Sequence, residues 1–124
     1  MREIKFRAWD KEEQEMLDWD KFFNLDIAQV FESKGSWGVY PMQYTGLKDS
    51  HGNEVYEGDI IEAVFELLDD ELKTVMDAGV VVFKDYGFQV QTFEDHYEPL
   101  HEWAQLSEEL KVIGNIYEHN HLLG

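Results

Sequence analysis

The first residues alternate between apolar and charged side chains. Over residues 4–9 this alternation has a period of two, which predicts a β-strand and places Arg7 and Trp9 together on one of its faces. A polar connector at residues 10–15 then leads into a short second segment, residues 16–19. We therefore expect an N-terminal β-hairpin.

The next segment has a different spacing. Most apolar residues of residues 20–33 recur three or four positions apart, which is the spacing of one face of a helix. Asp20 is placed to cap the first turn, and Gly35 follows as a stop signal. The spacing predicts a helix over residues 20–33.

A continuous run from Met42 to Ile61 carries the clearest folding signal. Its residues favour extended backbone, then a polar turn, then extended backbone again, and Gly58 marks a bulge or a tight bend before a stronger strand. The run therefore predicts strands at residues 42–45, 54–56 and 60–68, with a turn at residues 48–53. Rapid turning of this kind is typical of a small, strongly curved barrel.

The remaining sequence adds further strands. Pro41 indicates a sheet edge or a bend just before the central run. After it we expect an acidic loop at 69–74, a hairpin of 79–83 with 88–93, a loop at 94–99, a helical turn at 106–110 and a final strand at 111–117. The pattern predicts an all-β fold, mainly strands with one or two short helices, in a single domain of residues 1–124.

Composition agrees with a folded domain. The chain has 124 residues, of which 44% are hydrophobic and 15% aromatic, enough for a real core. It contains no cysteine, so disulfides, thiolate nucleophiles and sulfur-ligated metals are excluded. No signal peptide or membrane-spanning stretch is recognisable, and we expect a cytoplasmic protein.

Charge limits the class of partner. The formal net charge is −17, from 27 acidic and 10 basic residues. Such a charge opposes direct binding of nucleic acid and of anionic membranes, which both need clustered Lys and Arg. It is compatible with basic protein partners.

Three segments together resemble the YopX protein family of phages and prophages. They are residues 4–10 near the start, the central stretch from Gln43 to Ile60, and residues 112–118 near the end. The chain departs from the family pattern after Glu118, where His119-Asn120-His121 replaces the usual Asn-Pro-Glu. The resemblance spans nearly the whole chain.

The resemblance implies a small SH3-like β-barrel encoded by a phage or prophage, and it implies no catalytic residues. The residues that carry its central motif are those expected at the bends of a compact barrel. They are Tyr44, Gly46, Asp49, Gly52, Tyr56, Gly58 and Asp59. We interpret them as structural residues.

Histidines near the end of the chain are the candidate metal ligands. His119 and His121 would point the same way in a strand and, with Glu118, His96 or His101, could bind Zn²⁺ or Ni²⁺. The competing interpretation is an exposed tail. We favour the tail and expect no cofactor.

Carboxylates cluster at the bend in the central run. Glu57, Asp59 and Glu62 could act as acid and base in an enzyme if their surroundings separated their pKa values. The alternative is that Asp59 accepts backbone N–H groups at the bend while both glutamates face water. We favour the alternative and lean away from an enzyme.

Aromatic residues allow two further interpretations. They could form a stacking platform for single-stranded nucleic acid, or they could fill the core of a small barrel, which we favour. The residues concerned are Trp9, Trp19, Trp37, Trp103, Tyr40, Tyr44, Tyr56 and Tyr117.

The sequence favours a non-enzymatic interaction or accessory module. Trp37 and the acidic residues Asp69, Asp70 and Glu71 form the candidate interaction surface, with a protein partner and self-association both open. Two alternatives are an acidic mimic of nucleic acid that binds a host DNA-binding protein, and a metal-binding enzyme based on the histidines and turn carboxylates.

Overall fold

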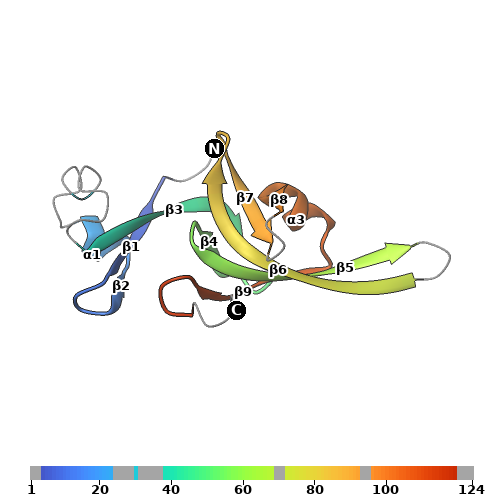
Figure 1. Ribbon diagram of the computed structural model, residues 1–124, viewed down its shortest axis with the longest axis horizontal. Helices are drawn as coiled ribbons and strands as arrows, with labels where there is room; N and C mark the ends of the chain where they lie inside the picture. Colours follow the sequence, from blue (N-terminus) through green and yellow to red (C-terminus); the bar gives the residue numbers. More distant parts are fainter. Residues whose placement is uncertain (1–3, 24–29, 31–37, 69–71, 93–95, 120–124) are drawn as a thin grey trace.

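The computed structural model describes residues 4–23, 30, 38–68, 72–92 and 96–119. Two antiparallel sheets make up most of this part of the chain, in the strand orders β2-β1-β3-β4 and β8-β7-β6-β5-β9 (Figure 1). The strands are β1 (Phe6–Asp10), β2 (Glu15–Leu17), β3 (Val39–Lys48), β4 (Glu54–Tyr56), β5 (Asp59–Leu68), β6 (Leu72–Lys84), β7 (Gly87–Thr92), β8 (Tyr97–Pro99) and β9 (Glu109–Asn115). The helices are α1 (Trp19–Phe23) and α3 (Leu100–Leu106). The all-β fold class is confirmed.

The predicted N-terminal hairpin is present. β1 pairs with β2, with Ala8 opposite Leu17. The Asp10 carboxylate accepts hydrogen bonds from the backbone N–H groups of Glu12 and Glu13, at 3.1 and 3.2 Å, and so closes the turn. Sequence reasoning succeeds here because the turn is built from neighbouring residues.

Helix α1 begins one residue earlier than predicted. Asp18, not Asp20, caps it: the Asp18 carboxylate accepts a hydrogen bond from the backbone N–H of Lys21 at 2.9 Å. Phe22 is fully buried, and it forms a small core with Ala8, Leu17 and Val30. Residues 24–29 and 31–33 of the predicted helix lie outside the described residues.

The central run folds as predicted up to β5. β3 pairs with β1 through Val39–Gln43 and with β4 at Tyr44 and Lys48, so Pro41 lies inside a strand opposite Ala8. Gly58 has a φ of +89° and turns the chain tightly from β4 into β5. This φ is in the left-handed region that favours glycine.

The five-stranded sheet contains the long β5–β6 pairing. β5 lies between β6 and β9, so the strong strand predicted at residues 60–68 is confirmed and has a partner on each side. The predicted β6–β7 hairpin is also confirmed, and its turn residues Asp85 and Tyr86 have φ values of +55° and +66°. Both positive values fit a two-residue turn that follows the twist of the flanking strands.

Three local predictions in this sheet were wrong. β6 begins at Leu72 and not near Gly79, so residues 72–74 belong to a strand. Residues 97–99, expected in a loop, form β8. The expected helical turn at residues 106–110 is replaced by the end of α3 and the start of β9. In β6 and β8 pairing with the preceding strand, and in β9 pairing with the distant β5, decides the backbone, and local propensity does not report these pairings.

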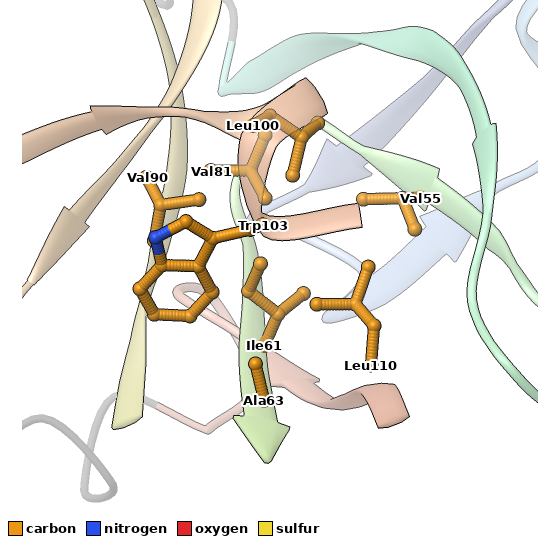
Figure 2. Packing of buried hydrophobic residues seen from close by; sticks show 8 residues of the cluster. All are labelled: Val55, Ile61, Ala63, Val81, Val90, Leu100, Trp103 and Leu110. Atoms are coloured by element: carbon orange, nitrogen blue, oxygen red, sulfur yellow. The ribbon is translucent and has the colours of Figure 1, made fainter. Parts of the chain in front are cut away.

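The larger core lies between the curled five-stranded sheet, which forms half a barrel, α3 and β4. Trp103 of α3 is only 2% exposed and packs edge-on against Phe65 of β5. Figure 2 shows how side chains from both sheets meet around it. The cluster consists of Val55, Ile61, Ala63, Val81, Val90, Leu100, Trp103 and Leu110. Val55 comes from β4, so the small sheet closes one side of this core.

Among the described residues, no helix has the length and apolar character needed to cross a membrane.

Candidate functional site

The Asp49 carboxylate organises the turn between β3 and β4. One oxygen accepts hydrogen bonds from the N–H groups of His51 and Asn53, at 2.9 and 2.8 Å. The other accepts the N–H of Val112 at 3.0 Å, so the same side chain also holds β9. Asp49 thus has a structural role in the turn, and the bond to β9 extends that role beyond the turn.

Hydrogen bonding also sets the acidity of Asp49. Burial acts to raise its pKa, but the N–H donors of Val112 and Asn53 favour the carboxylate. The net effect is that the pKa of Asp49 lies below its usual value. The turn is therefore built around an ionised carboxylate.

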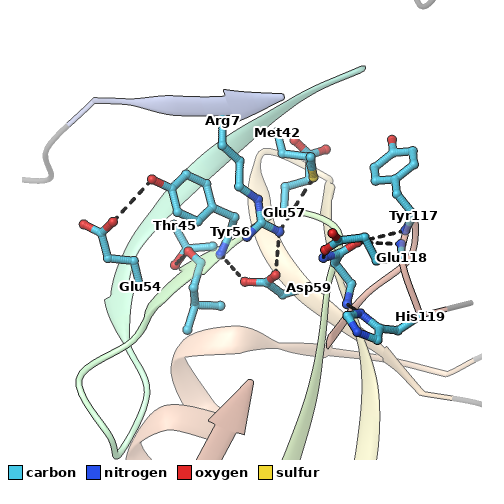
Figure 3. Close-up of polar contacts among 12 residues, drawn as sticks. Arg7, Met42, Thr45, Glu54, Tyr56, Glu57, Asp59, Tyr117, Glu118 and His119 are labelled. Atoms are coloured by element: carbon cyan, nitrogen blue, oxygen red, sulfur yellow. Dashed lines mark hydrogen bonds and ion pairs between the residues drawn. The ribbon is translucent and has the colours of Figure 1, made fainter. Parts of the chain in front are cut away.

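A second buried carboxylate, Asp59, pairs with an arginine from β1. Asp59 is 1% exposed, and its Oδ1 lies 2.5 Å from Nη2 of Arg7 (Figure 3). Its Oδ2 accepts the backbone N–H of Tyr56 at 2.7 Å. The Arg7 guanidinium also lies over the Tyr56 ring, 4.6 Å from its centroid. One ion pair thus ties β1 to the β4–β5 turn, where the two sheets join.

This second cluster has different electrostatics from the first. Burial raises the pKa of Asp59 above its usual value, and the Arg7 charge and the Tyr56 N–H only partly offset the effect. Burial, with the nearby Glu54 carboxylate, raises the pKa of the Tyr56 phenol to about 12. In both groups burial is the largest effect, and it favours the protonated form of the side chain.

A lysine completes the polar layer beside Tyr56. Lys5 forms an ion pair with Glu54, and its Nζ lies 4.9 Å from the centroid of the Tyr44 ring. Glu54 also lies 3.4 Å from the Tyr56 hydroxyl. A hollow of about 320 Å³ opens here. It is lined by Lys5, Asp18, Trp19, Asp20, Glu54 and Tyr56.

Three aromatic rings stack across the junction of the sheets. The Tyr117 ring stacks on both Trp9 and Tyr40, with centroid distances of 6.1 and 5.5 Å and interplanar angles of 13° and 26°. Burial raises the pKa of the Tyr117 phenol, and the Glu57 carboxylate adds to the effect. The three stacked rings lie beside the Glu57 side chain.

The turn after β9 positions Tyr117. The Asn115 side chain accepts the backbone N–H groups of Tyr117 and Glu118, at 3.0 and 2.9 Å. His119 accepts the Asn115 N–H through Nδ1 at 3.2 Å. This network gives residues 115–119 a defined local structure.

A cavity of about 130 Å³ lies next to this stack, between the two sheets. Residues from β3, the β4–β5 turn, β6 and the turn after β9 line it. Its lining comprises Pro41, Met42, Glu57, Gly58, Val80, Val81, Val82, Ile116 and Tyr117. Glu57 is the carboxylate in this lining, and its Oε1 accepts the Gln43 N–H at 3.3 Å.

The motif residues of the central run serve bends and buried contacts. Gly46, Gly52 and Gly58 have positive φ values of 88°, 85° and 89°. Tyr44 and Tyr56 are buried and their ring centroids lie 5.4 Å apart. Together with Asp49 and Asp59, they hold β3, β4, β5 and β9 in place.

The carboxylate cluster considered for catalysis divides among separate roles. Asp59 accepts the expected backbone N–H, but its ion pair with Arg7 was not foreseen. Glu57 lines the cavity, and Glu62 lies in β5 opposite Ala78 and Lys111. Both glutamates are half-buried and do not simply face water, as sequence suggested.

The expected aromatic core is largely present within the described residues. Trp9, Tyr44, Tyr56 and Trp103 are buried, whereas Trp19, Tyr40 and Tyr117 are half-buried. The candidate interaction surface, Trp37 with Asp69, Asp70 and Glu71, lies outside the described residues.

The candidate metal ligands do not meet in the part of the chain that the structure describes. There, no group of three or more His, Asp or Glu side chains could hold a metal ion. His119 uses Nδ1 in the turn after β9, and His96 and His101 are exposed. His121 lies outside the described residues.

Sequence reasoning missed the Arg7–Asp59 pair, whose members are 52 positions apart. One signal was available: the alternation in β1 places Arg7 on the same face as Trp9, which is buried. A charged residue on a buried face needs a partner. The identity of that partner could not be read from local sequence.

These features define a class, a small all-β protein in which two antiparallel sheets are joined by an ion pair, buried turns and an aromatic stack. The family model of the YopX protein matches residues 5–124, and the chain belongs to the YopX family. Among curated proteins, none matches it.

Two solved structures have the same fold. Protein EF1440 from Enterococcus faecalis is 24% identical with a TM-score of 0.63, and protein yopX from Bacillus subtilis is 20% identical with a TM-score of 0.57. In both cases the match covers 100% of each chain. At these identities the similarity establishes the fold and carries no function across.

Proposed function

We propose that the protein is a non-catalytic binding module, and that its main contact surface is the outer part of the β5–β6 pairing. The described pairing of β5 with β9 ends at Val64, and the pairing of β6 with β7 begins at Gly79. Beyond these points residues 65–68 pair with residues 72–75 and extend away from the rest of the sheet (Figure 1). Residues 76–78 continue the same strand toward Gly79 and pair with residues 62–64. The ribbon is therefore made of residues 65–68 and 72–78. We call these two segments the distal ribbon.

The observation that carries the proposal is the exposure of large apolar side chains on the distal ribbon. Leu67 is 51% exposed, Val75 40% and Met76 61%. Val75 and Met76 are consecutive in a strand and therefore point to opposite faces. Apolar surface on both faces of a two-stranded ribbon gains free energy when a partner covers it.

The edges of the distal ribbon support binding by strand addition. Within the described residues, no third strand pairs with residues 65–68 or 72–78. Unpaired backbone N–H and C=O groups along such an edge can pair with an extended segment of another chain. An extended peptide could thus be held by backbone hydrogen bonds and by the apolar side chains.

Charge favours a basic partner over a second copy of the same chain. The connection between the two ribbon strands carries Asp69, Asp70 and Glu71 in sequence, and the whole chain carries a net charge of −17. Two such surfaces repel each other, whereas a basic segment is attracted. Under this proposal the chain is a phage or prophage product that acts in the cytoplasm of its bacterial host.

A paired-variant capture experiment tests the proposal. Val75→Thr combined with Met76→Thr removes apolar surface and keeps good strand formers. Leu106→Gln is the matched control, because Leu106 is also exposed, at 67%, but lies on α3. The wild-type chain is immobilised, partners are captured from a lysate of the bacterium that carries the gene, and affinity is then measured with the purified partner.

We expect the ribbon variant to bind about tenfold or more weakly, which corresponds to about 1.4 kcal/mol, and the control to bind like wild type. Equal binding by all three chains would reject the ribbon as the contact surface. Light scattering at low and high salt tests self-association: a dimer that persists in the ribbon variant would assign dimer formation to another surface.

A nucleic-acid mimic is the second candidate, and the −17 charge favours it. Duplex DNA added to the captured complex distinguishes the two. Displacement of the partner by DNA supports mimicry, whereas a complex that DNA leaves intact supports strand addition on the ribbon.

A further inference from the structure

We propose that the cavity between the two sheets binds the cationic end of a lysine or arginine side chain supplied by a partner. The inference goes beyond the distal ribbon, because the cavity is built from β3, the β4–β5 turn, the middle of β6 and the turn after β9. Residues 65–68 and 72–78 contribute nothing to its lining.

The lining has the chemistry that such a side chain requires. Met42, Val80 and Ile116 present apolar surface, and Glu57 presents a carboxylate. The methylene groups of lysine or arginine pack against apolar walls while the charged end seeks an acidic partner. A neutral apolar ligand would bring no positive charge to this carboxylate, and an anion would be repelled by it.

The carboxylate is held in place. Glu57 accepts the Gln43 N–H through Oε1 at 3.3 Å, which restricts its rotation. It also lies close enough to Tyr117 to contribute to the raised pKa of that phenol, after the larger effect of burial. The Tyr117 ring is itself fixed by stacking on Tyr40 and Trp9. A preorganised acceptor loses little conformational entropy on binding.

The size of the cavity fits one side-chain end. Its volume is about 130 Å³. Since a water molecule occupies about 30 Å³ of liquid, the cavity has room for about four water-sized groups. The last four heavy atoms of lysine, or the guanidinium head of arginine, match that number. The net charge of −17 adds a long-range attraction for cations.

Small capped amino acids test the site directly. The probes are N-acetyl-lysine methylamide and N-acetyl-arginine methylamide, with N-acetyl-norleucine methylamide as the neutral control of similar shape. Binding is followed by the amide NMR shifts of Gly58 and Ile116, which line the cavity. We expect saturable shifts with the two cationic probes and none with norleucine.

Two variants and one control identify the acceptor. Glu57→Gln removes the charge and should weaken binding of the cationic probes by about tenfold or more. Glu62→Gln, a half-buried glutamate outside the cavity, should bind as wild type. Val82→Leu adds one methylene group to the lining and keeps the Glu57 carboxylate, so the smaller cavity should also weaken binding. If Glu57→Gln does not fold, Val82→Leu still decides the question.

The outcomes distinguish a cation site from an apolar pocket and from diffuse counterion binding. Equal binding of norleucine and lysine overturns the cation site and leaves an apolar pocket. Equal weakening by Glu57→Gln and Glu62→Gln overturns it in favour of diffuse counterion binding, as does binding that survives both Glu57→Gln and Val82→Leu. The ribbon variant Val75→Thr/Met76→Thr should keep probe binding, so either proposal can fail without the other.

Discussion

At the residue scale, Asp49 and Asp59 are both buried, yet their pKa values move in opposite directions. Asp49 accepts several backbone N–H groups, and these outweigh the effect of burial and lower its pKa. Asp59 is more deeply buried, and burial outweighs its ion pair with Arg7 and raises its pKa. The difference follows from the number of donors compared with the loss of water. Of the two carboxylates, Asp49 is therefore the one whose contribution to folding stability is lost as pH falls.

Replacement of Asp49 tests this assignment. The two oxygens of Asp49 accept the backbone N–H groups of Asn53 and Val112. In Asp49→Asn one of these oxygens is replaced by an NH₂ group, which is a donor, so one of the two N–H groups loses its acceptor. We expect a loss of about 1–3 kcal/mol of unfolding free energy at neutral pH, measured by urea denaturation. Glu13→Gln, at an exposed turn position, should change stability by less than about 0.5 kcal/mol.

The pH dependence of that loss has a defined sign. A carboxyl group whose pKa is lowered in the folded state adds stability above its unfolded pKa, near 3.8, and loses this contribution as pH falls through the folded value. The difference in unfolding free energy between wild type and Asp49→Asn should therefore become smaller below about pH 4. A gap of the same size at pH 3 and pH 7 would contradict the ionised carboxylate.

At the element scale, β6 is a single strand with two different environments. Up to Ala78 it forms the distal ribbon with β5, and from Gly79 onward it lies inside the five-stranded sheet between β5 and β7. Gly79 marks the change. A Cβ atom at this position would lie 2.5 Å from the Gln91 carbonyl oxygen and 2.7 Å from a Val90 methyl group. The close approach of β7 leaves no space for a side chain.

A pair of glycine substitutions tests this contact. Gly79→Ala should destabilise the protein by about 1–3 kcal/mol, because the obstructing atom belongs to backbone that cannot easily move. Gly87→Ala is the matched control in the neighbouring strand, where an added Cβ meets no atom within 4 Å. Thermal unfolding of both variants measures the difference. Similar melting temperatures would show that β7 can move away from β6.

The same scale shows which elements local sequence can predict. Both confirmed hairpins turn through nearby residues: Asp10 closes the first, and Asp85 with Tyr86 forms the second. The outer part of β6 was missed because its pairing partner, β5, provides the strand conformation, and exposure on both faces removes the simple apolar alternation. The cap of α1 was misplaced by two residues because Asp18 and Asp20 are both suitable caps by composition.

At the scale of the whole molecule, charge and shape act together. The chain has 27 acidic and 10 basic residues, so the folded protein repels itself across its surface. Specific contacts join the two sheets. They include the Arg7–Asp59 ion pair, the stack around Tyr117 and the insertion of Val55 into the larger core. These contacts hold the two sheets together although the many surface carboxylates repel one another.

Salt should therefore stabilise the fold. Raising ionic strength to about 0.15 M shortens the screening length to about 8 Å and weakens repulsion between surface carboxylates. We expect the urea midpoint to rise with sodium chloride. Tetramethylammonium chloride at equal ionic strength controls for specific sodium binding and should have the same effect. A midpoint that falls with salt would mean that attractive ion pairs dominate.

By itself the sequence determined the family, the all-β class, both hairpins and the position of the central turn. These depend on local turn chemistry and on period-two alternation, which neighbouring residues encode. Only the tertiary structure decided that Asp59 pairs with Arg7, that Asp49 also holds β9, and that Glu57 lines a cavity between the sheets. It also decided that residues 72–78 extend as a ribbon. The first three depend on which distant segments meet, and the ribbon depends on which strands end before it. Burial then determines how much each charged or apolar group at these contacts contributes to stability.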